Sequence, residues 1–329
     1  MPDNLIFAME VTLNGLMTGV MYALVALGFV LIYKASGIFN YSQGVMALFA
    51  AMTLVGIQEG RVPFSHLINA IFGTSLHNFA WNSVPALLAI LLTVAVMVLF
   101  AWAVQKFVFG HLVGQEPIIL FMATIGLAYF LEGMADLMWG SEIRTLDVGL
   151  PQGLNTVIDD TTYGWFGYGF FIDNLDIVAS IVAALLVAGL VAFAQYTKQG
   201  RAMRAVADDH QAALSVGISL NFVWILVWSL AGFVALVAGI MWGSKSGVQF
   251  SLSLIALKAL PVLMLGGFTS IPGAIVGGLI IGVGEALFEF AVGPMIGGAT
   301  ENWFAYVLAL IFLVFRPQGL FGEKIIERV

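Results

Sequence analysis

The sequence contains no cysteine and very little charge. The lack of cysteine excludes disulfide bonds, thiolate metal ligands and a cysteine nucleophile. Only 9% of the 329 residues are charged, whereas 61% are hydrophobic, and the mean hydropathy is +1.01. These values lie far outside the range of soluble domains, so they indicate an integral membrane protein that acts in or across the bilayer.

The motifs of several enzyme classes are also missing. The sequence has no P-loop for ATP, no nucleophile elbow of the G-x-S-x-G type and no H-E-x-x-H pair for zinc. Its four histidines are scattered, and neither a basic stripe nor base-stacking aromatics indicate nucleic acid. We therefore expect no catalytic residue, no metal site, no cofactor bound by this chain and no nucleic-acid partner.

Apolar runs of helix length dominate the chain, and they are continuous rather than alternating, which favours helices over the strands of a membrane barrel. The opening stretch MPDNLIFAME has no Lys or Arg, so we expect no cleaved signal peptide. The predicted fold is an all-α, polytopic helical bundle with eight or nine spans, some broken or re-entrant, in a single transmembrane domain over 1–329. The predicted spans are 11–33, 36–57, 84–105, 117–138, 176–196, 219–243, 252–268, 273–292 and 302–315.

The positions of Lys and Arg predict the orientation, because translocation tends to leave these residues in the cytoplasm. A cytoplasmic C-terminus places most of them inside, leaves Arg61, Arg144 and Lys245 outside and puts Lys258 in the membrane. With nine spans the N-terminus then lies outside. The longest polar connection, 139–175, becomes an outer loop, for which we expect a small loop structure or a short hairpin.

Two apolar segments are interrupted by glycine, proline and polar residues, as where transporters unwind helices beside a cavity. One interruption lies at Gly266, Gly267 and Pro272. The other precedes the second span, and its polar residues are candidates for a translocation pathway. They are Asn40, Tyr41, Ser42 and Gln43. A plain interhelical turn at the membrane surface is the alternative at each place.

Small residues recur at helical spacing on two predicted helices, and such residues let helix backbones approach closely in lipid. Gly15 and Gly19 lie on the first helix. The late helix carries Gly273, Gly277, Gly278 and Gly282. We predict that both helices face protein. Ordinary bundle packing and a tight contact beside a pathway both fit this pattern.

Charges within apolar segments are costly, at about 2.5–3.5 kcal/mol each at a helix centre on insertion scales. Lys258 and Glu285 are the main candidates, and a pair between neighbouring helices would offset much of that cost. Such a pair is either a structural ion pair or a group that contacts substrate or a proton. A lysine that extends its side chain to the membrane surface is a further alternative.

The most highly charged segment is TKQGRAMRAVADDHQAALSVGIS, residues 197–219, between two long apolar runs. Its alanine content predicts a short helix with a break, beginning after Gly200 and ending near Gly217. On the predicted topology this segment is cytoplasmic. The alternatives are a solvated amphipathic connector and a surface that binds a partner.

Four segments, in order along the chain, resemble the permease family of branched-chain amino acid importers. They are ALGFVLIYKASGIFNYSQG, GRAMRAVADDHQAALSVGI, KALPVLMLGGFTSIPGAIVGGLIIGVGEAL and FRPQGLFGE. The resemblance covers about 10 to 323. It implies a permease subunit of a bacterial inner-membrane ABC importer, with alternating access. The implied partners are a second homologous permease, two ABC ATPases that hold ATP and Mg, and a periplasmic solute-binding protein.

The same resemblance implies that loop 197–218 is a coupling helix that docks on the ATPase. The residues carried over for this contact are Gly200, Arg201, Arg204, Ala205, Asp208, Asp209, Ala212 and Gly217. Family members carry amino acids, urea, short amides or aromatic acids, so the substrate stays open. The stretch 61–82 is longer than the resemblance implies, and we expect an amphipathic insertion on the outer face.

A secondary carrier is the rival hypothesis, in which Lys258 and Glu285 couple transport to protons or ions without ATPases. It predicts transport by this chain alone and a strong effect of neutralising Glu285. The importer hypothesis predicts no transport without ATPases.

Overall fold

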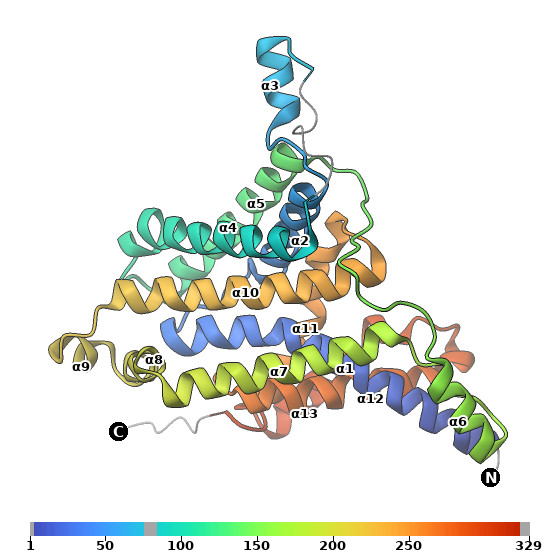
Figure 1. The fold of residues 1–329 in the computed structure, drawn as a ribbon. Coiled ribbons are helices and arrows are strands. Elements are labelled where there is room, and N and C mark those ends of the chain that lie inside the picture. Colours follow the sequence, from blue (N-terminus) through green and yellow to red (C-terminus); the bar gives the residue numbers. More distant parts are fainter. Residues whose placement is uncertain (1–2, 76–83, 323–329) are drawn as a thin grey trace. The chain divides into compact units, whose positions relative to one another are not determined.

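A computed structural model describes residues 3–75 and 84–322, and this part of the chain is built from helices (Figure 1). It contains no β-strand within these ranges, only isolated bridges between Arg144 and Val248 and between Leu154 and Asp173. The α-helices are α1 (Asp3–Ser36), α2 (Gln43–Gln58), α3 (Ser65–Phe72), α4 (Ala86–Phe107), α5 (Pro117–Trp139), α6 (Thr156–Phe166), α7 (Asn174–Tyr196), α8 (Lys198–Asp208), α9 (His210–Ser215), α10 (Leu220–Ser246), α11 (Ile255–Gly266), α12 (Ile271–Ile296) and α13 (Phe304–Phe315). Short 3-10 turns lie at Phe109–His111, Phe250–Leu254 and Thr300–Asn302.

Each predicted span contains a helix, which confirms the all-α, polytopic fold. Six of these helices are long and apolar enough to cross a membrane, and they are α1, α4, α5, α7, α10 and α12. The other three predicted spans correspond to shorter apolar helices, Gln43–Gln58, Phe250–Gly266 and Phe304–Phe315. Two of the short ones are the segments expected to be broken, 36–57 and 252–268.

The chain divides into two compact units. Unit 1 comprises Met1–Val30, Leu150–Gly189 and Leu257–Val329, and unit 2 comprises Leu31–Gly149 and Leu190–Ala256. The division falls inside α1, α7 and α11, so these helices contribute residues to both.

Unit 2 is built around α2, whose residues from Gln43 to Gly56 are all buried. A helix that is apolar on all sides is stable only when other elements surround it, and α4, α5 and α10 pack against α2. Glycine permits a close approach of α10 to α2, since a Cβ on Gly239 of α10 would lie 2.6 Å from the carbonyl oxygen of Ala47. The short apolar helix α2 is therefore a core element of its unit.

In unit 1, α1 and α12 approach each other through the glycines singled out in the sequence. A Cβ on Gly15 would lie 2.8 Å from the carbonyl oxygen of Gly282, and a Cβ on Gly278 would lie 2.5 Å from that of Gly19. A Cβ on Gly277 would meet the carbonyl oxygen of Val262 on α11 at 2.6 Å. No larger residue fits at these positions without moving a backbone.

The expectation of a small loop or short hairpin at 139–175 is wrong, because the segment contains the 11-residue helix α6. Asn155 caps its first turn by accepting a hydrogen bond from the backbone N–H of Ile158 at 2.9 Å, and Gly167 ends it with φ +70°. Past that helix, Phe170 and Ile172 form a small buried cluster with Ile6 of α1.

The expected insertion at 61–82 is described only in part, since residues 76–83 lie outside the described residues. Its described part contains α3, which is capped at its C-terminal end by Gly73. Leu67, Ile71 and Phe72 on this helix are exposed.

Candidate functional site

The polar break before α2 is largely enclosed by its own unit. Asn40, Ser42 and Gln43 are 0%, 0% and 1% exposed. The Ser42 hydroxyl donates to Asn40 Oδ1 at 2.6 Å, and Gln43 Nε2 donates to the carbonyl oxygen of Ala231 on α10 at 3.3 Å. Tyr41 differs, with 39% of its surface exposed. Of the four predicted pathway residues in this unit, only Tyr41 presents its side chain outward.

The intramembrane charges predicted to pair do so in unit 1. Lys258 Nζ of α11 lies 3.2 Å from Glu285 Oε1 of α12, and Glu285 is 4% exposed. The Tyr22 hydroxyl of α1 donates to Glu285 Oε2 at 3.1 Å. Lys258 also donates to the carbonyl oxygen of Glu301. Two carboxylate oxygens and one ammonium are thus satisfied by groups from three helices and a turn.

The turn between α11 and α12 meets the tail motif. Ser270 caps α12, since its hydroxyl accepts the backbone N–H of Gly273 at 3.0 Å. The backbone N–H groups of Leu320 and Phe321 donate to the carbonyl oxygens of Leu265 and Gly266 at 2.8 and 3.1 Å. These bonds satisfy carbonyls that the end of α11 leaves free.

The charged segment 197–219 forms two short helices, α8 and α9. The first helix begins at Lys198 and not after Gly200, because Thr197 caps it by accepting the Gly200 N–H at 2.9 Å. Gly200 lies inside the first turn, where a Cβ would be 2.5 Å from Ala194 Cα of α7. Glycine is required there to let α8 fold back on the end of α7.

Asp209 makes the break, because its extended backbone ends α8 and its carboxylate caps α9. Asp209 Oδ1 accepts the backbone N–H groups of Gln211 and Ala212 at 2.7 and 3.0 Å. These bonds, chiefly that from Ala212, lower the pKa of Asp209 below its ordinary value of 3.8. Gly217, at φ +84°, then closes α9 with Gly217 N–H to Leu214 O and Ile218 N–H to Ala213 O, both at 3.0 Å, which is a Schellman motif.

The two faces of this helix pair differ in character. Gly200, Met203, Val206 and Ala213 are buried against the rest of unit 2. The outward face is formed by charged, small and apolar residues, with Ala205 at its edge. The exposed members are Arg201, Arg204, Asp208, Asp209, Ala212, Leu214, Val216 and Gly217. Leu214 and Val216 are 53% and 74% exposed, so the face combines charge with unburied apolar surface.

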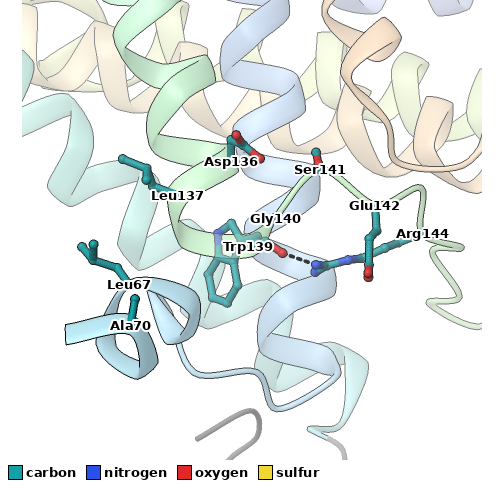
Figure 2. Close-up of a pocket in the computed structure, with 9 residues that line it drawn as sticks. All are labelled: Leu67, Ala70, Asp136, Leu137, Trp139, Gly140, Ser141, Glu142 and Arg144. Atoms are coloured by element: carbon teal, nitrogen blue, oxygen red, sulfur yellow. Dashed lines mark hydrogen bonds between the residues drawn. The ribbon is translucent and has the colours of Figure 1, made fainter. Parts of the chain in front are cut away.

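A cavity of about 480 Å³ lies in unit 2, between α3, the end of α5 and the chain that follows it (Figure 2). Trp139 and Arg144 form part of its lining, and an Arg144 guanidinium nitrogen donates to the carbonyl oxygen of Trp139. Glu59 pairs with Arg61, Nε to Oε2 at 2.6 Å, and lies 3.8 Å from Arg144 Nη1.

Sequence reasoning missed two of these features. Tyr22 is separated from Glu285 by 263 residues, and no sequence pattern around it predicts that its hydroxyl contacts this carboxylate. Arg144 was placed only as an outer cation, although its position just beyond an apolar run, in a segment otherwise rich in carboxylates, is a signal that it has a partner.

The chain matches the family described as "Branched-chain amino acid transport system / permease component" over residues 11–316. It is 28% identical to the high-affinity branched-chain amino acid transport system permease protein BraD of Pseudomonas aeruginosa, with 96% of each chain covered. It is 26% identical to the LivH permease protein of Escherichia coli K12, over 100% of each. The solved structure of PsaBC from Streptococcus pneumoniae in complex with Fab aligns over 92% of this chain and 89% of that one, at a TM-score of 0.42 and 13% identity, too low to support an argument. Because the family match extends over most of its length, the chain belongs to the permease component family of branched-chain amino acid transport systems.

Proposed function

We propose that this permease works in the bacterial inner membrane as one subunit of an ABC importer for branched-chain amino acids or related small solutes. The family and its relatives support this role, and the relatives are named for branched-chain amino acid transport. The whole chain, 1–329, acts as one transmembrane permease domain with a cytoplasmic C-terminus. ATP and Mg bind to partner ATPases, and a second permease and a periplasmic binding protein complete the transporter.

The outward face of α8 and α9 carries this proposal. Leu214 and Val216 place exposed apolar surface beside charged residues, a combination that suits contact with a protein partner. Arg201, Arg204 and Asp208 offer charge pairs to that partner. Burial of Met203 and Val206, with the close contact at Gly200, fixes the helix pair to its own unit. Movement of the ATPase would therefore be passed to α7 and α10 as rigid-body motion.

The translocation pathway is assigned to the polar break and to the intramembrane pair. Tyr41 is its exposed member, and Asn40, Ser42 and Gln43 become available if the helix break opens during alternating access. Lys258 and Glu285 belong to the other unit. Because each is the charge partner of the other, we assign them a structural role in the pathway. No observation favours the secondary carrier over the importer.

The decisive experiment is affinity purification of the tagged chain from its native membrane in mild detergent, with mass spectrometry of the co-eluting proteins. We expect two P-loop ATPases and a second permease with the wild type. Arg204→Glu should lose the ATPases, whereas Lys245→Glu, a charge reversal in the last turn of α10 on the predicted outer side, should retain them. Recovery of a stable chain without partners, or equal recovery in both variants, would contradict the assignment.

A further inference from the structure

An apolar groove lies between two membrane-spanning helices of unit 2. Its lining comes from α4, the residue that follows it, and α5, and both helices pack against the buried helix α2. The volume is about 440 Å³, and every described residue of the lining is apolar, with Phe100, Phe107 and Phe130 among them. Gly126 of α5 also lines the groove, and nothing lies within 4 Å of the position that a Cβ would take there. The chain therefore leaves open space between α4 and α5.

A lysine lies at one end of this groove. Lys106 is exposed in the last turn of α4, and its Nζ lies 5.7 Å from the centre of the Phe107 ring, which lines the groove. The same Nζ lies 4.7 Å from the centre of the Trp102 ring. Both distances are within the range of a cation–π interaction. The two rings therefore hold the ammonium beside the groove.

The charge of Lys106 has no acidic partner in its own unit. No carboxylate among the residues that the structure describes forms an ion pair with it. On the topology predicted from Lys and Arg, Lys106 lies on the cytoplasmic side, and basic pockets between helices on that side bind anionic lipid head groups. A cation above an apolar groove is complementary to an anionic phospholipid, which has a phosphate at one end and acyl chains at the other.

The size of the groove favours an acyl chain over a helix of a partner subunit. An α-helix is about 10–12 Å across and rises about 1.5 Å per residue, so a volume of 440 Å³ would hold only about one turn. The volume lies within the range of small-molecule sites, about 300–1,000 Å³. A flexible acyl chain can follow a narrow groove of this kind.

We propose that the groove between α4 and α5 is a binding site for an anionic phospholipid of the bilayer. Lys106 binds the phosphate, and one acyl chain lies along Phe107 toward Phe100 and Phe130. The lipid then fills the space between two helices that both pack on α2.

The test of the head group uses the tagged chain, purified with its co-eluting partners and reconstituted in phosphatidylcholine nanodiscs. The probes are phosphatidylglycerol and phosphatidylcholine with the same photoreactive acyl chain, and mass spectrometry maps the labelled peptides. Half-maximal labelling of residues 100–108 and 123–130 should need about fivefold less phosphatidylglycerol than phosphatidylcholine, because one lysine near the membrane surface contributes about 1 kcal/mol. Lys106→Gln should abolish this difference, whereas Lys106→Arg should keep it.

Two results would overturn the proposal. Equal labelling by both lipids, or a difference that persists in Lys106→Gln, would show that Lys106 selects no head group. Absence of label from the groove, with label elsewhere on the chain, would show that a partner subunit covers it.

Matched glycine variants test the place of the acyl chain. Gly126→Phe fills the groove from an open position on α5. The control is Gly189→Phe, because Gly189 is an exposed glycine of α7 that also has nothing within 4 Å of a Cβ and lies outside the lining. Labelling of the groove peptides by phosphatidylglycerol should fall at least about tenfold in Gly126→Phe and stay unchanged in Gly189→Phe. Unchanged labelling in both variants would place the bound chain outside this groove and contradict the assignment.

Discussion

We predict that removing Lys258 from the ion pair of unit 1 destabilises the chain more than removing the charge of Glu285. Lys258→Met leaves Glu285, 4% exposed, as a buried carboxylate whose remaining partner is the Tyr22 hydroxyl at 3.1 Å. Removing one partner of a buried pair typically costs about 3–5 kcal/mol. Glu285→Gln should cost less, about 1–3 kcal/mol, because Lys258 is 22% exposed in its side chain and still donates to the carbonyl oxygen of Glu301.

The double variant Lys258→Met/Glu285→Gln removes both charges and should return to within about 2 kcal/mol of the wild-type free energy of unfolding, since paired replacement is often near neutral. The assay is a denaturant titration of the detergent-solubilised chain, followed by a double-mutant cycle. Additive losses, or a Glu285→Gln variant less stable than Lys258→Met, would refute this reasoning. Uptake by the assembled importer adds a functional test: the double variant should still transport if the pair is structural, whereas a proton-coupled pair would leave it inactive.

Three further predictions concern helix contacts and caps. Gly278→Leu would place its Cβ 2.5 Å from a carbonyl oxygen of α1, so it should lower the free energy of unfolding by about 1–3 kcal/mol in the same titration. The control is Gly126→Leu, which should have no such effect because nothing lies within 4 Å of a Cβ at that position. Equal stability of the two variants would contradict the close approach of α1 and α12. Asp209→Ala should speed hydrogen exchange across α9 at pH 7, whereas Asp209→Asn should not, because asparagine caps equally well. Because folding lowers the pKa of Asp209, the stabilisation by its carboxylate is complete at pH values above the unfolded pKa of 3.8 and is lost as the pH falls through the lower folded pKa. In that lower pH range, hydrogen exchange across α9, corrected for intrinsic rates, should become faster in the wild type but not in Asp209→Asn. Gly217→Ala should fray the end of α9 by about 1–2 kcal/mol, since φ +84° disfavours a Cβ, and unchanged exchange at residues 213–218 would count against that.

Long apolar runs made most of the fold predictable. A continuous run of about 20 apolar residues has few alternatives to a helix in a membrane, so the positions of α4, α5, α7, α10 and α12 follow directly. The Lys258 and Glu285 pair was also predictable, because two opposite charges in neighbouring apolar helices leave few other partners.

The remaining features depend on tertiary contacts that no local pattern encodes. The helix α6 depends on its cap at Asn155 within a polar, glycine-rich loop, where composition favoured irregular structure. The start of α8 was misplaced because Gly200 resembles a helix boundary, while its actual role is close contact with Ala194. The cavity at Arg144 is assembled from segments on both sides of α4 in the sequence, so only the folded chain shows it.

The length of α1 has a consequence for how the chain meets the bilayer. Its 34 residues extend about 51 Å, whereas the hydrocarbon core is about 30 Å thick. Tilts of up to about 40° do not absorb this hydrophobic mismatch. Part of α1 therefore projects beyond the hydrocarbon, and its first turns have their own cover: Ile6 packs with Phe170 and Ile172, and Glu10 accepts the backbone N–H of Phe171 at 3.1 Å. The segment after α6 thus covers the first turns of α1 with protein, so these turns keep protein contacts at whatever depth the bilayer meets the helix.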